Sequence, residues 1–215
     1  GQVDDFATMT DLGRALRRKL AESFGNARLE LLDTVHSADG SRKYLFGLTD
    51  GRRMESVLMP ERDHYTLCIS SQVGCPLACR FCLTGRTGFE RNLTVGEILS
   101  QVRDVRYRLP DPEKLTNLVF MGMGEPLANY ANLVAAIETL TDTEAGLGLA
   151  ARRITVSTAG LADRLADLGR DTRVNLAISL NAVDNDTRSR LMPINRTYPL
   201  EQLLDACRRY PLPRG

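Results

Sequence analysis

From about residue 65 onward, short apolar runs of strand type alternate with segments of helical periodicity, and this alternation restricts the fold more than any other feature. The apolar runs lie at 66–70, 117–122, 154–158 and 174–180, and the helical segments lie near 94–109, 130–141, 161–169 and 199–210. Strands that are apolar along their whole length are typical of parallel sheets covered by helices. The sequence therefore predicts an α/β fold in which four strand–helix units form a parallel sheet.

The residues before this alternation have a different pattern. Residues 10–24 have helical periodicity with Thr10 as the expected cap, and three strand-like runs separated by Asp-Gly hairpin signals occupy 29–59. The third run alternates, and the pattern alone favours an edge strand with both faces in water. We therefore expect a small α+β segment at 1–62, followed by the parallel unit at 63–215.

Polar residues and glycines follow each predicted parallel strand. These segments are the cysteine-rich loop after residue 70, Gly122–Pro126, Ser157–Gly160 and Ser179–Asn181. In a parallel sheet the carboxyl ends of the strands share one edge, and functional groups collect there. The sequence thus predicts one site built from four loops.

The first of these loops contains Cys75, Cys79 and Cys82, with the spacing C-x3-C-x2-C. A structural zinc site takes four closed ligands, which would recruit Cys68 upstream. Zinc ribbons usually present two separated C-x2-C pairs, and this loop does not. An iron–sulfur cluster held by three cysteines leaves one iron open, and the spacing favours this alternative. Cys207 lies at helical spacing with leucines, and we expect it in the core.

Composition argues against several classes of protein. No apolar run approaches the roughly 20 residues of a membrane span, and the first residues lack the pattern of a secretory signal. Five cysteines, four of them between positions 68 and 82, do not resemble a secreted disulfide framework. We therefore expect no membrane partner and a reducing, cytoplasmic location. The net charge of +1 favours no particular partner.

The cysteine spacing resembles that of the radical S-adenosylmethionine (radical SAM) superfamily. Phe81 before the last cysteine, and the sequence GMGEP at Gly122–Pro126, also resemble motifs of that superfamily. The resemblance implies a partial (βα)6 barrel with about four units present. It also implies that Cys75, Cys79 and Cys82 hold a [4Fe–4S] cluster whose open iron binds S-adenosylmethionine (SAM). An electron from the cluster cleaves SAM to a radical in such enzymes.

The chain resembles more specifically the RlmN/Cfr family of RNA adenine methyltransferases. The matching segments run in the family's order over almost the whole chain and include SSQVGC, CRFCLTG, MGMGEPLANY, RRITVSTAGL, LAISLNA and LMPINRTYPLEQLL. The resemblance implies methylation of adenine C2 in the peptidyl-transferase centre of 23S rRNA and beside the tRNA anticodon. Cfr-type C8 methylation, another radical enzyme such as an activase, and a four-cysteine zinc module that binds RNA are the alternatives.

The resemblance also implies roles for individual residues. The residues that would contact SAM are Gly124, Glu125, Ser157, Ser179, Leu180 and Asn181, although the family usually has His at the last position. Cys68 matches the cysteine that resolves a methyl-cysteine intermediate, and Glu55 matches the base that removes the adenine proton. Pattern alone makes Cys68 a small buried strand residue. Glu55 needs a dry pocket with a raised pKa, which its apolar strand face could supply.

The resemblance covers only part of the family's length. Two further barrel strands, the cysteine that carries the methyl group and most of an N-terminal helical domain have no counterpart in this chain. We therefore expect a fragment that does not transfer methyl groups, with an open sheet edge after its fourth parallel strand. The implied partners are 23S rRNA, tRNA and an electron donor of the flavodoxin type.

Overall fold

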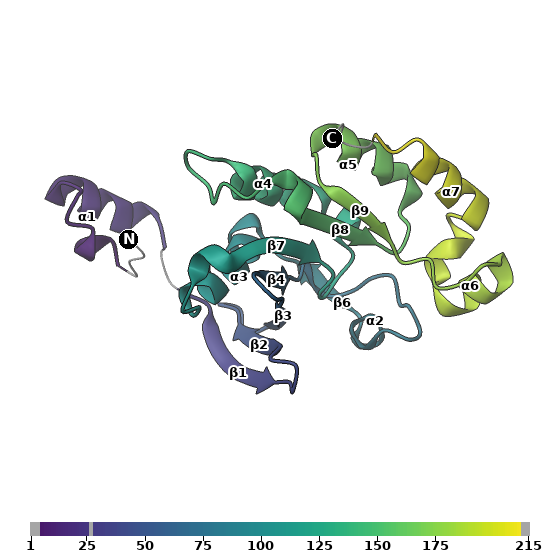
Figure 1. Cartoon of the computed structure of the whole chain (residues 1–215), viewed down its shortest axis with the longest axis horizontal. Coiled ribbons are helices and arrows are strands. Elements are labelled where there is room, and N and C mark those ends of the chain that lie inside the picture. The colour runs from purple at the N-terminus through teal and green to yellow at the C-terminus, as the bar shows by residue number, and fades with distance from the viewer. Residues whose placement is uncertain (1–4, 26–27, 212–215) are drawn as a thin grey trace.

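The computed structural model describes residues 5–25 and 28–211, so the outermost residues of the two expected segments lie outside the description. A seven-stranded sheet forms the centre, in the order β1-β2-β3-β4-β7-β8-β9 (Figure 1). Its strands are β1 (Glu30–His36), β2 (Arg42–Gly47), β3 (Arg53–Pro60), β4 (Tyr65–Cys68), β7 (Leu115–Phe120), β8 (Ile154–Thr158) and β9 (Asn175–Ile178). Strands β1 to β4 pair antiparallel. Strands β4, β7, β8 and β9 pair parallel, which confirms the predicted parallel unit.

Helices connect and cover these strands. They are α1 (Arg14–Ser23), α2 (Leu83–Thr87), α3 (Val95–Tyr107), α4 (Tyr130–Thr141), α5 (Leu165–Asp171), α6 (Asn185–Leu191) and α7 (Leu200–Arg208). Short 3-10 helices are η1 (Phe6–Thr8), η2 (Pro112–Lys114), η3 (Pro126–Asn129), η4 (Ala151–Arg153), η5 (Ala162–Arg164) and η6 (Pro193–Arg196). A second, small sheet pairs β5 (Gln72–Gly74) with β6 (Phe89–Asn92). Within the described ranges, no helix has both the length and the apolar character needed to cross a membrane.

The hydrophobic core lies between one face of the parallel strands and the helices that connect them. Leu67, Leu118 and Ile154 of adjacent strands are completely buried, as are Ile98 of α3 and Leu133 of α4. Side chains alternate between the two faces along a strand. The alternate residues of β4, β7 and β8 are only half-buried, so the second face of the sheet can accept ligands.

The structure confirms most predicted elements and corrects two expectations. Helix α3 forms in the predicted segment near 94–109 and begins with a capping box, in which Thr94 Oγ1 accepts from Glu97 N–H at 3.2 Å and the Glu97 side chain accepts from Thr94 N–H at 2.9 Å. Cys207 packs against the core, as predicted. Thr10 does not cap α1, because η1 and a turn precede the helix and Gly13 is its N-cap. Strand β3 is not an edge strand, because β2 and β4 pair with its two sides.

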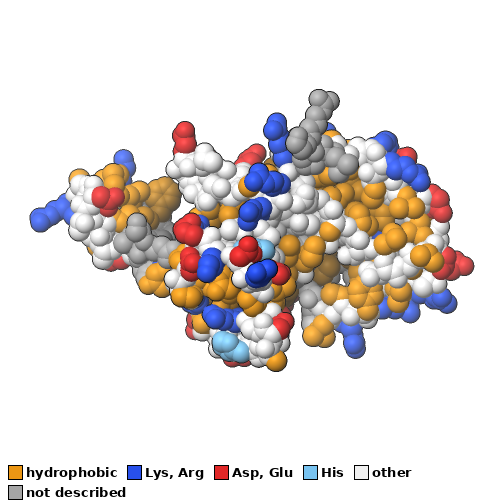
Figure 2. Space-filling view, viewed as in Figure 1, with side chains coloured by type: hydrophobic (Ala, Val, Ile, Leu, Met, Phe, Trp, Pro, Cys, Tyr) orange, Lys and Arg blue, Asp and Glu red, His pale blue; other side chains and the backbone are white. Residues whose placement is uncertain are grey.

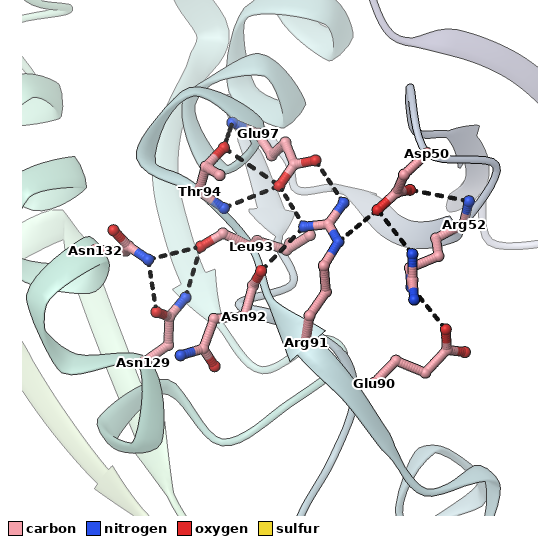
Figure 3. Close-up of polar contacts among 10 residues, drawn as sticks. All are labelled: Asp50, Arg52, Glu90, Arg91, Asn92, Leu93, Thr94, Glu97, Asn129 and Asn132. Carbon is pink, nitrogen blue, oxygen red and sulfur yellow. Dashed lines mark hydrogen bonds and ion pairs between the residues drawn. The ribbon is translucent and has the colours of Figure 1, made fainter.

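A polar network joins the turn between β2 and β3 to the start of α3 (Figure 3). Arg91 of β6 donates to Asp50 Oδ2 at 2.6 Å and to both carboxylate oxygens of Glu97 at 2.8 Å. Asp50 also accepts from Arg52, which in turn donates to Glu90 at 2.8 Å. These contacts connect the antiparallel strands to the first strand–helix unit next to the cysteine loop.

Strand β9 lies at one edge of the described sheet, as predicted for the fourth parallel strand. Hydrophobic side chains gather on the visible face over β9 and the helices that follow it, while basic and acidic side chains lie at the rim of this region (Figure 2). Within the described part of the chain, no strand pairs with the outer side of β9, and an open edge beside an apolar surface favours association.

Candidate active site

A cavity of about 230 Å³ opens at the carboxyl ends of β7, β8 and β9, beside the cysteine loop. Its wall is mainly apolar with a few polar groups, which is typical of small-molecule sites. The lining residues are Cys75, Leu77, Cys79, Phe81, Cys82, Phe120, Met121, Gly122, Gly124, Glu125, Ser157, Thr158, Ala159, Ser179 and Met192. All four loops predicted from the sequence therefore contribute to one cavity.

The backbone fixes the course of the cysteine loop. Cys75 N–H donates to Gly88 O at 3.0 Å, next to the small sheet that closes the base of the loop. Gly74 has a φ of 73°, and a Cβ there would collide with Gly88 O. Ala78 has a φ of 50°, in the left-handed region that a residue with a Cβ rarely adopts. The loop thus accepts local strain in order to bring its three thiols to the same cavity.

Burial disfavours the thiolate forms of Cys75 and Cys79. Burial is the main cause that raises the pKa of Cys75 to about 11. The Glu125 carboxylate raises this pKa as well, whereas a hydrogen bond from Leu77 N–H lowers it. Burial also raises the pKa of Cys79, while the positive charge of Arg188 lowers it. Metals bind thiolates, so metal binding at this loop must release protons. With a pKa of about 11, the Cys75 thiol keeps its proton at neutral pH until a metal displaces it.

Two glycines of the GMGEP segment let the end of β7 pass close to the chain that follows β4. A Cβ on Gly122 would lie 2.7 Å from Ser70 Oγ, and a Cβ on Gly124 would lie 2.5 Å from Gln72 Cβ. Gly124 also has a φ of 99°, which only glycine adopts readily. This close crossing is what brings Glu125 to the wall of the cavity.

Glu125 is the buried acid of the cavity, with 3% of the residue exposed. Its Oε1 accepts from Leu127 N–H at 3.1 Å, and its Oε2 accepts from Ala159 N–H at 2.8 Å. Burial raises its pKa, while these two amides and the Thr158 hydroxyl lower it. A carboxylate has further acceptor capacity on both oxygens, so Glu125 can also accept hydrogen bonds from an ammonium group of a ligand.

Ser157 and Ser179 end adjacent strands, and both line the cavity with their Oγ atoms 3.5 Å apart. The next two predicted SAM contacts do not line it. Leu180 packs against the core, and its carbonyl accepts from Arg188. Asn181 is exposed, with a φ of 55°, and donates to Met192 Sδ at 3.4 Å. The roles of Leu180 and Asn181 in SAM binding stay predictions.

Glu55 and Cys68 share the half-buried face of the sheet but lie outside the cavity. Val57 of β3 pairs with Cys68 of β4, so Glu55, two residues earlier on β3, is on the same face as the thiol. Burial raises the pKa of Cys68 to about 11. Glu55 forms an ion pair with Lys43 Nζ at 3.0 Å, and its side chain is 40% exposed. The dry pocket expected around Glu55 is therefore not formed by the residues that the structure describes.

Sequence reasoning missed the contribution of α6 and the turn after it. Met192 is completely buried and lines the cavity from that turn. Arg188 of α6 is also completely buried, and it donates to the carbonyls of Leu180 and Ala159 behind the cavity. The only signal for Met192 was the family segment LMPIN, and the polar sequence of α6 has no apolar stripe that would predict a helix.

Comparison with known proteins decides the family. The sequence model of the Radical SAM superfamily matches residues 69–211. The chain belongs to this superfamily. It is 55% identical, over 98% of its own length and 57% of the relative's, to "Dual-specificity RNA methyltransferase RlmN" from Desulfosudis oleivorans. It is also 55% identical to the protein of the same name from Geobacter sulfurreducens, over 97% of this chain and 56% of that one.

A solved structure gives the same result for the fold. The crystal structure of a radical SAM methyltransferase from Sphaerobacter thermophilus matches with a TM-score of 0.90 and 43% identity, over 97% of this chain and 62% of that chain. The predicted partial radical SAM barrel is therefore confirmed. The chain spans 57% of the length of the first relative and 62% of the solved structure.

The site fits the cofactors of this superfamily, a [4Fe–4S] cluster and SAM, as the resemblance implied. Thiolates are the soft ligands that iron–sulfur clusters take. In the described residues, no three Cys, His, Asp or Glu side chains lie close enough to hold a single metal ion. The three thiols that line the cavity would hold such a cluster. Cys68, the fourth ligand of the zinc alternative, does not line the cavity with the other three.

Proposed function

We propose that this chain is the cofactor-binding part of a radical SAM RNA methyltransferase that methylates C2 of adenosines in RNA. One observation carries the proposal: three thiols, a buried carboxylate and two serines from four separate loops line a single cavity. The 55% identity to proteins named dual-specificity RNA methyltransferase supports the same reaction. The proposed substrates are an adenosine in the peptidyl-transferase centre of 23S rRNA and an adenosine beside the tRNA anticodon.

In this proposal Cys75, Cys79 and Cys82 hold the [4Fe–4S] cluster. When bound, the cluster supplies the electron that cleaves SAM reductively and begins radical chemistry. The backbone contacts of the cysteine loop hold the three thiols around one cavity, so less conformational entropy is lost on binding. Phe120 and Met192, both almost completely buried, give the cavity an apolar wall that keeps water from one side of it.

Glu125, Ser157 and Ser179 orient SAM in this proposal. Both oxygens of Glu125 are already held by backbone amides, so the carboxylate keeps its position whether or not a ligand is bound. It accepts hydrogen bonds from the amino group of SAM. The two serine hydroxyls lie at the ends of adjacent strands and donate to polar groups on the other side of the ligand.

Glu55 and Cys68 act on the RNA base in this proposal. An adenine must leave its stack before an enzyme can reach C2, so the substrate is an unpaired or extruded nucleotide. Both side chains lie on the half-buried face of the sheet, where an extruded base can approach them. Glu55 serves as the base that removes the adenine proton, and Cys68 serves as the resolving thiol.

Anaerobic reconstitution of the chain with iron and sulfide tests the cofactor part of the proposal. We expect iron and sulfide equivalent to one [4Fe–4S] cluster per chain, with visible charge-transfer absorption. Cys75→Ala should lose this absorption, whereas Cys207→Ala should keep it because Cys207 packs against the core on α7. A colourless chain that takes up only zinc contradicts the proposal.

Mass spectrometry of cellular RNA tests the substrate. A strain that lacks the gene for the whole protein should lose 2-methyladenosine from 23S rRNA and tRNA, and the wild-type gene should restore it. The same gene carrying Glu55→Gln should not. Appearance of 8-methyladenosine instead would favour the Cfr-type alternative, and unchanged RNA would contradict both.

Two further parts of the proposal concern the surroundings of the enzyme. The electron comes from a reductant of the flavodoxin type. The protein works in the cytoplasm, where cysteines such as those of this loop stay reduced. Reduction of the reconstituted cluster by purified flavodoxin under anaerobic conditions, followed by electron paramagnetic resonance (EPR), tests the first point.

A further inference from the structure

Arg188 of α6 is a buried cation without an acidic partner among the residues that the structure describes. Its side chain is completely buried, and no carboxylate of the described residues forms an ion pair with it. Its hydrogen bonds end on neutral acceptors: Nε on Leu180 O at 3.1 Å, Nη1 on Asn195 Oδ1 at 2.8 Å and Nη2 on Ala159 O at 2.6 Å. A buried charge strongly destabilises a folded chain unless an opposite charge compensates it. An anion other than a carboxylate of this region would compensate the charge.

The helix that carries Arg188 adjoins the cysteine loop. Arg80 N–H donates to the carbonyl of Leu191, the last residue of α6, at 2.8 Å. Cys79 directly precedes Arg80, and Cys79 and Arg188 interact electrostatically. Burial lowers the pKa of Arg188, whereas the nearby Cys79 raises the pKa of Arg188. A guanidinium nevertheless stays charged at any physiological pH. A permanent positive charge thus lies behind one of the proposed cluster ligands.

Arg188 also joins the loops that build the cavity. Ala159 follows β8, Leu180 follows β9, and Asn195 lies in η6 after the lining residue Met192. Gly160 makes room for this contact: its φ is 117°, and a Cβ there would lie 3.1 Å from Arg188 Nη2. One guanidinium therefore fixes three segments that are far apart in the sequence.

We propose that Arg188 is a positioning residue that holds these loops around the iron–sulfur cluster and, through its charge, makes the cluster easier to reduce. An oxidised [4Fe–4S] core with three thiolates carries net negative charge, which is the anion that the buried guanidinium lacks. Reduction adds one electron from an external reductant and makes the site more negative, so a fixed positive charge stabilises the reduced form. This inference rests on the cluster ligands of the proposed function.

A redox titration of the reconstituted chain, poised with dithionite and followed by EPR, tests the charge. Arg188→Gln and Arg188→Met should lower the equilibrium constant for reduction on the order of tenfold, which is about 59 mV for a one-electron couple. Arg188→Lys keeps the charge but loses the planar fork of donors. We expect this variant to melt at a lower temperature and to keep a potential near that of the wild type.

A second variant tests the charge without removing the arginine. Asn195→Asp places a carboxylate where Oδ1 lies 2.8 Å from Arg188 Nη1, so it should shift the potential in the same direction as Arg188→Gln. Arg91→Met is the matched control, because Arg91 pairs with Asp50 and Glu97 outside the cavity. It should lower the melting temperature and leave the potential unchanged.

The outcomes separate this inference from the proposed function. Full iron content with an unchanged potential in both Arg188→Gln and Asn195→Asp overturns the role of Arg188 and leaves the cluster ligands standing. A wild-type chain that takes up no iron overturns both. If Arg188→Gln does not fold, Asn195→Asp and Arg188→Lys test the inference instead. Asn195→Asp should shift the reduction potential, and Arg188→Lys should not.

Discussion

Arg91 holds the junction between the antiparallel strands and the first strand–helix unit, and Arg91→Met tests how strongly that junction stabilises the fold. Its guanidinium contacts both oxygens of Glu97 at 2.8 Å. The two side chains are 26% and 18% exposed. Exposed ion pairs contribute about 0.2–1 kcal/mol, and hydrogen bonds to charged groups contribute about 1.5–3 kcal/mol. We expect the half-buried, bidentate pair of Arg91 and Glu97 to contribute an intermediate free energy of about 1–2 kcal/mol. For a chain of this size, that lowers the melting temperature by about 2–8 °C.

A double-mutant cycle with Arg91→Met and Glu97→Gln, measured by urea and thermal unfolding, gives this coupling free energy directly. Gln at this position keeps an acceptor for Thr94 N–H, so the cap of α3 is preserved. Arg18→Met is the matched control, because its pair with Glu22 spans 3.8 Å and the side chains are 80% and 67% exposed. We expect no measurable change there. A coupling free energy within error of zero for Arg91 and Glu97 would refute the reasoning.

The pH dependence of stability gives an independent check on the same network. The hydrogen bond from Arg91 lowers the pKa of Asp50 to about 2. Burial raises the pKa of Glu97, but Arg91 and the Thr94 amide together lower it by a larger amount, so the net shift is downward. A carboxyl whose pKa falls on folding stabilises the fold above its unfolded pKa, and the contribution disappears as the pH falls through the folded pKa. The difference between wild type and Arg91→Met should be full above about pH 5 and shrink toward about pH 2. A constant difference contradicts this.

The remaining predictions concern the core and the cavity. Leu118→Ala removes a completely buried side chain from β7 and should cost about 2–5 kcal/mol in urea unfolding. Gly124→Ala forces a Cβ against Gln72 and should abolish SAM binding in calorimetry of the reconstituted chain, whereas Gly13→Ala, with nothing within 4 Å of the new Cβ, should not. Cys68→Ala should leave iron uptake unchanged, because Cys68 does not line the cavity; loss of iron would restore the four-cysteine alternative.

Topology explains why the site could be predicted before the structure. Glu125, Ser157 and Ser179 lie far apart in the sequence, but each follows an apolar strand of the parallel type. Parallel pairing of β4, β7, β8 and β9 places their carboxyl ends at one edge whatever the details of packing. The gathering of these residues therefore needed only the correct order of strands and helices.

Burial of β3 shows what an alternating pattern leaves open. Met54 and Leu58 are buried on one face, at 0% and 1% exposed, while Glu55 lies on the other. The alternation alone does not distinguish an edge strand with both faces in water from an interior strand with one face buried. Which of the two applies depends on the neighbours β2 and β4, and a single strand's sequence does not contain that information.

The role of Arg188 could not be predicted from the sequence, because no sequence pattern identifies its hydrogen-bond partners. Two of its three hydrogen bonds end on main-chain carbonyls, 8 and 29 residues away, and any residue type supplies a carbonyl. The proposed cysteine ligands differ from Arg188, since a metal cluster would set both their residue type and their short spacing. Residues that touch a ligand are therefore visible as motifs, whereas a residue that holds the backbone becomes visible only when its burial is known. A buried guanidinium that makes hydrogen bonds only to neutral acceptors then points to a nearby anion, because an uncompensated buried charge is costly.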